Sequence, residues 1–352
     1  ETLVVTLATV AATIFLYVIM PKGFLPLQDT GLITAVTEAG TDVSFAEMGR
    51  RQQAVESAIR GDPDVASVIS VIGVSPLNAT PNAGRLQINL KPRDERKARV
   101  EAIVERLKQA VAPIPGMTVY FQPVQDVQIS TQSSRSQYQY TLTSNDTDSL
   151  YRIAPEMREK ISHVPGLLDV TTDLYVKNPQ ITVEVDREKA GVYGVTIDQV
   201  RQELYNAFGS RQVATIYTPA NDYQVILETK PEFQTSPDDL GRIFLKTSSG
   251  VTVPLSAVTR FVRTVGPLQV NHQGQQPSVT ISFNLAPGFS LGEAVDAISR
   301  IERDDRLPAT IATGFQGTAQ VFQDSLRGQG ILILAAIFAA YVVLGILYES
   351  FI

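Results

Sequence analysis

Cysteine is absent from the 352-residue chain, and histidine occurs only twice. The lack of cysteine suits an oxidising space such as a bacterial periplasm, where a stray thiol is a liability, although many cytosolic proteins lack cysteine too. Neither His163 nor His272 has a second histidine or a cysteine at the spacing of metal ligands. The four methionines are scattered along the chain, at Met20, Met48, Met117 and Met157. The composition therefore predicts no metal site.

A strong excess of charge of either sign is also absent. The chain carries 30 Lys and Arg against 36 Asp and Glu, a formal net charge of -6 at pH 7. A nearly balanced, slightly acidic chain lacks the excess of basic residues that binds nucleic acid, and it lacks a polybasic segment that would attach to anionic lipids. The sequence contains no G-x-S-x-G elbow, no P-loop and no dinucleotide fingerprint. We therefore expect neither an enzyme nor a bound cofactor nor a nucleic-acid partner.

Charged side chains are missing from two long apolar runs, residues 2–20 and 330–347. A helix of about nineteen residues rises roughly 28 Å, close to the hydrocarbon thickness of a bilayer. Each run therefore predicts a membrane-spanning helix, with a buried core helix as the alternative. We reject a cleaved signal peptide for the first run, because Glu1 stands in place of a basic start and Lys22 follows the apolar segment. Two spans would hold the intervening residues on one side of the membrane.

The first half of the intervening region alternates strand and helix patterns. Ser44, with Glu47 three residues later, predicts a capped helix after a strand at residues 31–39. The segment RLQINLK, residues 85–91, places apolar and polar side chains on alternate faces of a strand. A helix with apolar residues at the 3.6-residue period follows, and the segment GMTVYFQ closes the unit as a strand. The predicted order of elements is βαββαβ.

The second half begins in the same way, with a strand at YQYTLT, a helix and a strand at LLDVTTDLY. Short echoes of the first half at the helix-to-strand junctions support an internal repeat. The remaining strand, helix and strand of this second unit appear only after residue 266, and residues 179–266 have strands and a helix of their own. We interpret residues 179–266 as a small mixed domain inserted into a second βαββαβ unit. A duplication of this kind, tied to two spans, is typical of transporters.

Five motifs occur along the chain in the order MPKGFLPLQDTG, VEVDREKAGVYGVTIDQV, VPLSAV, LAPGFSLGEA and LYESF. Together they resemble the resistance-nodulation-division (RND) multidrug efflux transporters, of the AcrB/MdtB/MdtC type in the hydrophobe and amphiphile branch. The resemblance covers essentially the whole chain and implies a membrane-anchored α+β fold. Two ferredoxin-like βαββαβ porter subdomains are expected between two transmembrane helices, with a mixed α/β docking subdomain interrupting the second.

The resemblance also implies domain boundaries, and it makes the chain a fragment of a longer pump. The expected segments are residues 1–22 for transmembrane helix seven, 23–132 for porter subdomain PC1, 133–178 and 267–318 for the two parts of porter subdomain PC2, 179–266 for docking subdomain DC, and 319–352 for a connecting helix and transmembrane helix eight.

The implied function is secondary active transport by proton antiport in the inner membrane of a Gram-negative bacterium, with residues 23–329 periplasmic. The pump would export drugs and other hydrophobic or amphiphilic molecules as a homotrimer or heterotrimer, together with a membrane-fusion adaptor and an outer-membrane channel. Neither apolar run holds Asp, Glu, Lys, Arg or His, so the proton-relay groups are expected on other helices. The alternatives are a membrane-anchored periplasmic scaffold or sensor, and a protein-export accessory of the same superfamily, which the DC insert disfavours.

In the family, the substrate cleft lies between PC1 and PC2, beside a switch loop that corresponds to residues 73–84 here. This loop is rich in Gly, Pro, Asn and Ser, which favours mobility. The AcrB type carries Phe in this loop, whereas this chain has Val74, Pro76 and Leu77, so aromatic stacking from the loop is not expected.

The other expected site residues lie on strands, where every second side chain lies on the same face. The substrate-binding residues expected from the resemblance are Val74, Pro76, Leu77, Tyr120, Gln122, Val124 and Tyr140. The expected switch-loop residues are Gly73, Ser75, Asn78 and Gly84. For the aromatic residues, packing within a sheet is the alternative.

Overall fold

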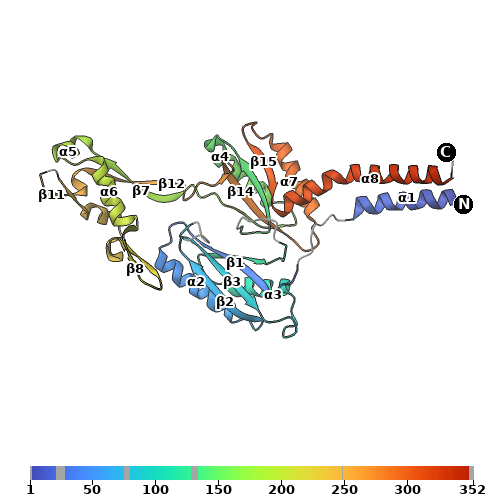
Figure 1. Ribbon diagram of the computed structural model, residues 1–352, viewed down its shortest axis with the longest axis horizontal. Helices are drawn as coiled ribbons and strands as arrows, with labels where there is room; N and C mark the ends of the chain where they lie inside the picture. Colours follow the sequence, from blue (N-terminus) through green and yellow to red (C-terminus); the bar gives the residue numbers. More distant parts are fainter. Residues whose placement is uncertain (1, 21–27, 75–79, 128–133, 248, 349–352) are drawn as a thin grey trace. The chain divides into compact units, whose positions relative to one another are not determined.

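The structure is a computed structural model that describes residues 2–20, 28–74, 80–127, 134–247 and 249–348 (Figure 1). It separates into two compact units, one formed by Glu1–Val176 with Pro267–Ile352 and the other by Lys177–Gly266. The smaller unit is therefore an insertion in the larger one, since the chain leaves the larger unit after Val176 and returns to it at Pro267.

The first sheet of the larger unit is built from consecutive elements. They are β1 (Leu32–Ala39), α2 (Phe45–Arg60), β2 (Val65–Ile72), β3 (Ala83–Leu90), α3 (Val100–Val111) and β4 (Met117–Pro123). The sheet has the strand order β2-β3-β1-β4, and all neighbouring strands are antiparallel. The side chain of Ser44 accepts a hydrogen bond of 3.2 Å from the backbone N of Glu47, so the predicted helix cap is confirmed. The βαββαβ order is also as predicted.

The second sheet of the larger unit has the same element order with one extra short strand, β13, and it is interrupted by the inserted unit. Its elements are β5 (Tyr138–Thr143), α4 (Thr147–Ser162), β6 (Leu167–Thr172), β13 (His272–Gln273), β14 (Gln276–Leu285), α7 (Leu291–Asp305) and β15 (Ala312–Gln316). The strands follow the order β13-β14-β5-β15, and β6 also pairs with β14. Ser290 and Glu293 form a reciprocal capping box at the start of α7.

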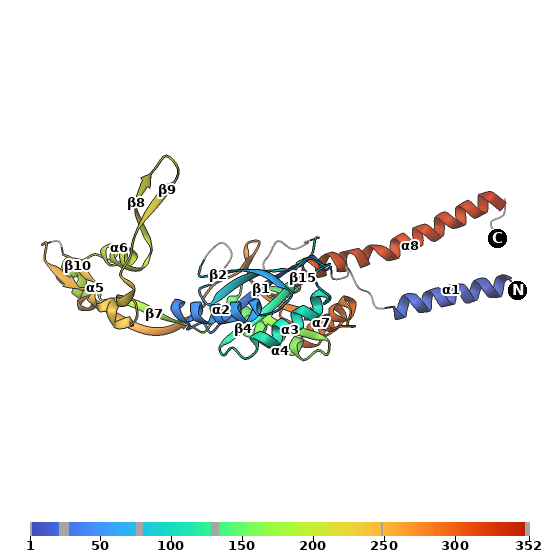
Figure 2. The same ribbon diagram turned by 90° about the horizontal axis from the view of Figure 1, so that it is seen from below.

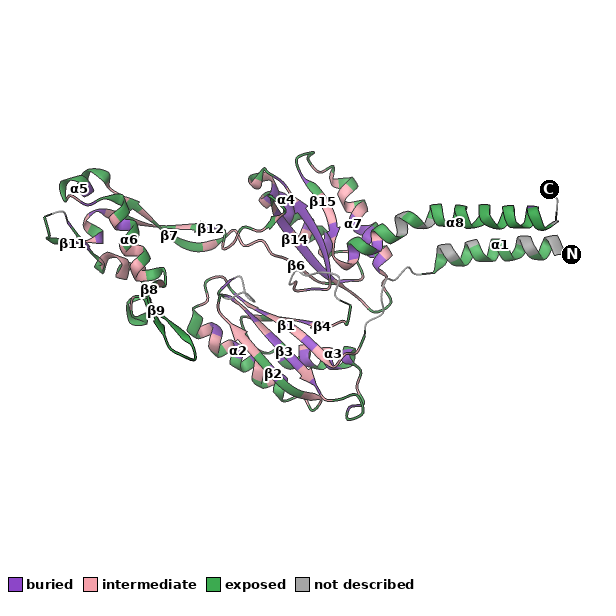
Figure 3. Cartoon of the chain, in the orientation of Figure 1, coloured by how far each residue is buried: buried purple, intermediate pink, exposed green. Residues whose placement is uncertain are grey.

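Each sheet has an apolar face in a hydrophobic core and an opposite, more polar face. On β14, Val279, Ile281 and Phe283 are at most 1% exposed and belong to the second core. Ser278, Thr280 and Ser282, at the alternate positions of β14, lie on the other face and line a cavity described below. Figure 3 shows β14 largely in the colour of buried residues. In the first sheet, the predicted apolar face of β3 is confirmed by its buried residues Leu86, Ile88 and Leu90. Each sheet therefore has one polar face whose side chains are available to line a binding site.

The inserted unit has a small core of its own. It contains the antiparallel pair β7 (Asn178–Val185) and β12 (Thr259–Gly266), helices α5 (Arg187–Val192) and α6 (Ile197–Phe208), the hairpin β8 (Arg211–Tyr217) with β9 (Asp222–Leu227), and the pair β10 (Phe244–Lys246) with β11 (Thr252–Pro254). Three short 3-10 helices complete it, η1 (Pro231–Phe233), η2 (Pro237–Arg242) and η3 (Leu255–Ala257). Figure 2 shows the hairpin of β8 and β9 extending away from α5 and β10 of the same unit. Thr196 and Gln199 form a capping box at the start of α6.

Both apolar runs are helical, α1 (Thr2–Ile19) and α8 (Thr318–Tyr348). In the part of the chain that the structure describes, one helix is long and apolar enough to cross a membrane, over Thr318–Leu347. The apolar side chains of Ile331 and Leu334 are 73% and 68% exposed, whereas Ala319 and Phe322 near the start of α8 are buried in the second core. The segments predicted as a connecting helix and a span form one helix up to Tyr348, and its crossing of a membrane stays a prediction. A span by α1 stays a prediction.

Gly84, which we expected in the switch loop, is the second residue of β3 and lies under a buried polar pair. A Cβ atom at Gly84 would lie 2.5 Å from Oγ1 of Thr37 and 2.9 Å from Oε1 of Gln52. Thr37 donates a hydrogen bond of 2.6 Å to Gln52, and both side chains are buried. Any side chain at Gly84 must displace this pair.

We therefore expect Gly84→Ala to lower the free energy of unfolding by about 1–3 kcal/mol, as overpacking does in other cores. Urea denaturation of the purified protein, followed by circular dichroism, measures the change. The control is Gly314→Ala on β15, where an added Cβ would meet nothing within 4 Å. Equal losses of stability in the two variants would contradict the steric explanation.

Candidate functional site

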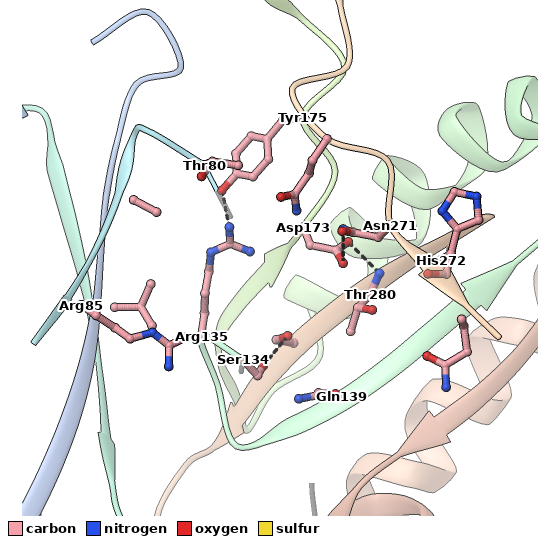
Figure 4. A pocket seen from close by; sticks show the side chains of 16 residues that line it. Thr80, Arg85, Ser134, Arg135, Gln139, Asp173, Tyr175, Asn271, His272 and Thr280 are labelled. Carbon is pink, nitrogen blue, oxygen red and sulfur yellow. Dashed lines mark hydrogen bonds between the residues drawn. The ribbon is translucent and has the colours of Figure 1, made fainter. Parts of the chain in front are cut away.

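A polar cavity of about 320 Å³ is lined by the polar faces of both sheets in the larger unit (Figure 4). β1 and β3 contribute side chains from the first sheet, and β5 and β14 contribute side chains from the second. The lining residues that matter for its chemistry are Val36, Arg85, Arg135, Gln139, Asp173 and Tyr175.

Arg135 links the two halves of this cavity. Its Nε donates a hydrogen bond of 2.7 Å to Glu38 on β1, and its Nη1 donates one of 3.2 Å to the carbonyl of Thr172 at the end of β6. Its Nη2 bonds the hydroxyl of Tyr175, which donates in turn to Glu38. Burial raises the pKa of Glu38 above its usual value, although the charge of Arg135 opposes this shift. All three nitrogens of the Arg135 guanidinium are therefore engaged.

Asp173, just after β6, is a carboxylate in the lining of the cavity. Its Oδ1 accepts a hydrogen bond of 2.7 Å from the backbone N of Thr280, and its Oδ2 accepts one of 2.8 Å from the side-chain amide of Asn271. Burial raises the pKa of Asp173, and the hydrogen bond from Thr280 opposes the shift. Both oxygens are thus satisfied within the protein (Figure 4).

A second cavity, which we call the apolar cleft, has a volume of about 570 Å³ and also lies in the larger unit. One side is formed by α3 and the end of β4, and the other by the start of β5, β6 and the loop between β14 and α7. Its walls include Phe121, Gln122, Tyr138, Leu168, Leu285 and Phe289. Apolar and aromatic walls with a few amides are typical of sites that bind organic molecules by burial.

An ion pair joins the two sides of the apolar cleft. Nζ of Lys108 on α3 lies 3.0 Å from Oδ2 of Asp169 on β6. The same Asp169 oxygen accepts a hydrogen bond of 3.0 Å from Asn284, and the backbone oxygen of Asp169 accepts one of 3.1 Å from Ser136. Asp169 itself has a left-handed backbone, with φ of 50°. This carboxylate is therefore the point where the first sheet's helix layer contacts the second sheet.

The expected site residues do not lie together in one cavity. Gln122 lines the apolar cleft. Tyr120 is half-buried beside Glu38, and burial raises the pKa of Tyr120 to about 12. Val124 is half-buried after β4 and bonds Leu32 and Thr30 through its backbone.

The expected loop residues are only partly visible. Val74 is 71% exposed, and Gly73, with φ of 87°, follows β2. Ser75, Pro76, Leu77 and Asn78 lie outside the described residues.

Tyr140 lies in the second core rather than in either cavity. It is 1% exposed, and its ring centroid lies 5.2 Å from that of Phe315. Its hydroxyl donates a hydrogen bond of 3.2 Å to Glu302 on α7. Gln139, between the two tyrosines, faces the polar cavity, whereas Tyr138 lines the apolar cleft. Alternation along β5 could have indicated Gln139 once its core face was known.

The remaining cavity residues were missed for a different reason. Leu285 and Phe289 belong to the motif LAPGFSLGEA, which the sequence analysis used only as a mark of resemblance. Arg85 and Arg135 are separated by 50 positions, and nothing in their local sequence shows that they line one cavity. Arg85 is on β3 and Arg135 lies just before β5, and the sheets of these two strands share no strand pairing among the described residues, so only the arrangement of the two sheets within the larger unit brings them together.

Metal-binding side chains do not gather in the described residues, where no group of three or more His, Cys, Asp or Glu could hold a metal ion. Met48 on α2 and Met157 on α4 are both fully buried. Neither cavity therefore has a ligand set for a soft or borderline metal ion.

Comparison with known proteins gives two findings. The model of a family described as the AcrB/AcrD/AcrF family matches residues 1–352. Two crystal forms of a heavy-metal efflux pump match with a TM-score of 0.82 and 20% sequence identity, covering 97% and 99% of this chain. This chain spans only 36% of the length of that pump. At this identity the likeness shows the mixed α+β fold, and it leaves the substrate open.

Proposed function

Because the chain belongs to the AcrB/AcrD/AcrF family, we propose that it is the periplasmic, substrate-handling part of a proton-driven RND efflux pump in the inner membrane of a Gram-negative bacterium. In this proposal the two βαββαβ units are ferredoxin-like porter subdomains, and the inserted unit is the docking subdomain. The complete pump works as a homotrimer or heterotrimer with an adaptor and an outer-membrane channel. The proton-relay residues lie on helices outside this chain.

We propose hydrophobic and amphiphilic organic molecules as the substrates. The observation that carries this proposal is the apolar cleft, with Phe121, Leu168, Leu285 and Phe289 in its walls and a volume of about 570 Å³. Burial of apolar area gives affinity without strict geometry, so such walls suit ligands of varied shape. The amide of Gln122 supplies a polar contact that can orient a ligand.

The position of the cleft also supports a transport step. Its two sides belong to different βαββαβ units, so a rotation of one unit against the other changes the width of the cleft. The pair of Lys108 and Asp169 spans the two sides at 3.0 Å and is partly exposed, with side chains 33% and 27% accessible. A partly exposed ion pair contributes little stability and can open at low cost.

Export of metal ions is the second candidate, because the structures with the same fold belong to a heavy-metal efflux pump. Against it stand the absence of cysteine from the sequence and the lack, in the described ranges, of a cluster of metal ligands. Soft metal ions are bound by thiolate and thioether groups, and the described cavities offer neither. A membrane-anchored scaffold without transport activity remains the alternative from another class.

Narrowing the apolar cleft tests the proposal. We expect Leu168→Trp and Gln122→Trp, made in the full-length pump, to reduce resistance to the larger dyes and detergents several-fold and to spare small compounds. The reason is that an indole fills part of the cleft volume. Minimal inhibitory concentrations in cells lacking other efflux pumps, with zinc, copper and silver salts in the same panel, measure the effect.

The matched control is Ile69→Trp, since Ile69 is a 54% exposed aliphatic residue on β2 and is not among the residues lining the cleft. An unchanged spectrum in both cleft variants at normal expression would remove the cleft from the transport path. Resistance to metal salts alone in the wild-type pump would favour the second candidate. If the wild-type pump confers resistance to no compound in the panel, the result would favour a scaffold without transport activity.

A further inference from the structure

A third cavity lies entirely within the inserted unit, where the end of α6 meets the base of the hairpin of β8 and β9 (Figure 2). Its volume is about 420 Å³, and its walls come from the last turns of α6, the end of β9, η1 and η2. Among the described residues, none that lines this cavity also lines the polar cavity or the apolar cleft. The lining residues that carry its chemistry are Glu203, Phe208, Leu227, Glu228, Phe233, Asp239 and Arg242.

Two phenylalanine rings line this third cavity. Phe208 is the last residue of α6 and is 40% exposed, and Phe233 is the last residue of η1 and is 44% exposed. The backbone N of Thr229 donates a hydrogen bond of 2.9 Å to the carbonyl of Ala207, and the side-chain amide of Gln234 donates to the carbonyl of Thr229. Thr229 thus joins the two segments that carry the rings. The face of an aromatic ring is partly negative and attracts a cation.

The charges in the lining are predominantly negative, with three carboxylates and one guanidinium. Arg242 lies 3.5 Å from Asp239, so these two charges are paired with each other. Glu203 accepts a hydrogen bond of 3.1 Å from the neutral amide of Asn206. The described residues offer the carboxylate of Glu228 no hydrogen bond and no ion pair. The lining therefore has two negative charges for which the described residues supply no cation.

The end of α6 adds to this negative potential. The carbonyl end of a helix carries a partial negative charge, equivalent to about half an elementary charge, over its last turn. The last turn of α6 contains no basic residue. Arg211, which begins β8, donates to the side chain of Asn206 and is not among the residues that line the cavity. A positive group in the cavity would therefore be attracted by the helix end, by two carboxylates and by two ring faces.

We propose that this cavity of the inserted unit binds a small quaternary ammonium compound. The rings of Phe208 and Phe233 would contact the alkylammonium group, and Glu228 would be its counter-ion. A quaternary ammonium has no N–H to donate, so it is bound by charge, ring faces and apolar contact, which are the groups that this cavity provides. The side chains of Leu227 and Ile243 supply the apolar contact.

Other classes of small molecule fit this cavity less well. An anion would be repelled by Glu203 and Glu228. A neutral molecule of the same shape would keep the apolar contacts and lose the attraction to the carboxylates and ring faces. Recognition should therefore depend on the positive charge of the ligand. Because the cavity lies outside the apolar cleft, binding here is a property separate from the proposed export function.

The test compares choline with 3,3-dimethylbutan-1-ol, a neutral molecule of the same shape in which carbon replaces the ammonium nitrogen. Binding to the purified full-length pump is measured by saturation-transfer NMR titration in a maltoside detergent, which contains no choline group. We expect the wild type to bind choline about tenfold more tightly than the alcohol, the equivalent of roughly 1.4 kcal/mol. Added salt should weaken the binding of choline and leave that of the alcohol unchanged.

Variants of two lining residues place the ligand in this cavity. Glu228→Gln, which removes the charge and keeps the shape, should weaken choline binding about fivefold. Phe233→Leu, which removes the ring face, should weaken it about threefold, whereas Phe233→Trp should bind choline at least as tightly as the wild type, because indole is the best ring for cations. The matched control is Glu232→Gln, which should leave the affinity unchanged. Glu232 is an exposed carboxylate of η1 that pairs with Lys230 at 3.7 Å and does not line the cavity.

Three results would overturn the ammonium site. They are equal binding of choline and the alcohol, no binding of choline to the wild type, and choline binding that both Glu228→Gln and Phe233→Leu leave unchanged. Circular dichroism identifies a variant that does not fold; if Phe233→Leu is one, Glu228→Gln decides, because Glu228 is exposed and its replacement disturbs no packing. Export is judged separately by the resistance panel. A failed choline test leaves export standing, and a loss of all resistance leaves the ammonium site standing.

Discussion

Replacing Asp29 with asparagine is expected to lower the free energy of unfolding by about 3 kcal/mol, because the buried guanidinium of Arg96 loses its carboxylate. The side chain of Arg96 is 1% exposed and that of Asp29 is 19% exposed. Arg96 donates to both oxygens of Asp29, and Arg93 adds a contact of 2.6 Å. Asp29 also accepts from the backbone N of Val100 at the start of α3.

The effect of Asp29→Asn should depend on pH. The hydrogen bond from Arg96 lowers the pKa of Asp29 in the folded protein, although burial opposes the shift. A carboxyl group with a lowered pKa stabilises the folded state fully above the pKa of the unfolded chain, and this stabilisation is lost as the pH falls through the folded pKa. The difference between the wild type and Asp29→Asn should therefore be largest near neutral pH and shrink below about pH 4.

Urea denaturation of the purified protein at several pH values, with hydrogen exchange of β1 and α3, measures this prediction. The control is Glu184→Gln in the inserted unit, which breaks an exposed pair with Arg260 at 2.6 Å. Exposed pairs contribute little because water screens them, so this variant should remain close to the wild type. A loss of stability in Asp29→Asn that is the same at every pH would show that charge is not the cause.

Tyr140→Ala is expected to destabilise the protein by about 3–5 kcal/mol, the usual cost of removing a buried aromatic ring. Tyr140 is one of the largest fully buried side chains, and it packs against Phe315 across β5 and β15. Its removal would leave a cavity in the middle of the second core. Unfolding by urea should show a lower midpoint, with a comparable slope if the unfolded state is unchanged.

Tyr140→Phe separates the contribution of ring packing from that of the hydroxyl group at the same position. The variant keeps the ring and loses the hydrogen bond of 3.2 Å to Glu302, which still accepts one of 2.6 Å from Thr313. We expect a cost of about 1 kcal/mol or less and an unchanged export spectrum in the full-length pump. An altered spectrum in Tyr140→Phe at normal stability would place Tyr140 in the substrate path after all.

Local patterns in the sequence were enough to predict the secondary structure that builds these sites. The cap at Ser44, the alternation of Leu86 and Ile88, and the βαββαβ order all follow from interactions between residues close in the chain. The insertion was visible as an interruption of a repeat, expected over residues 179–266 and observed as a compact unit over Lys177–Gly266. Such features depend on periodicity and on backbone chemistry, and both can be read from sequence.

The tertiary structure alone decided which side chains share a cavity. Strand alternation shows that Tyr140 and Gln139 lie on opposite faces of β5, but only the packing of α4 and α7 shows that the tyrosine face is the core. Arg85 on β3 and Gln269 in the loop before β13 line one cavity although they are nearly two hundred positions apart, and within the described ranges no strand pairing joins their two sheets. Sequence therefore determined the elements and their apolar faces, because these depend on local periodicity. Long-range packing determined the site, because the burial and the contacts of each side chain depend on what lies across from it.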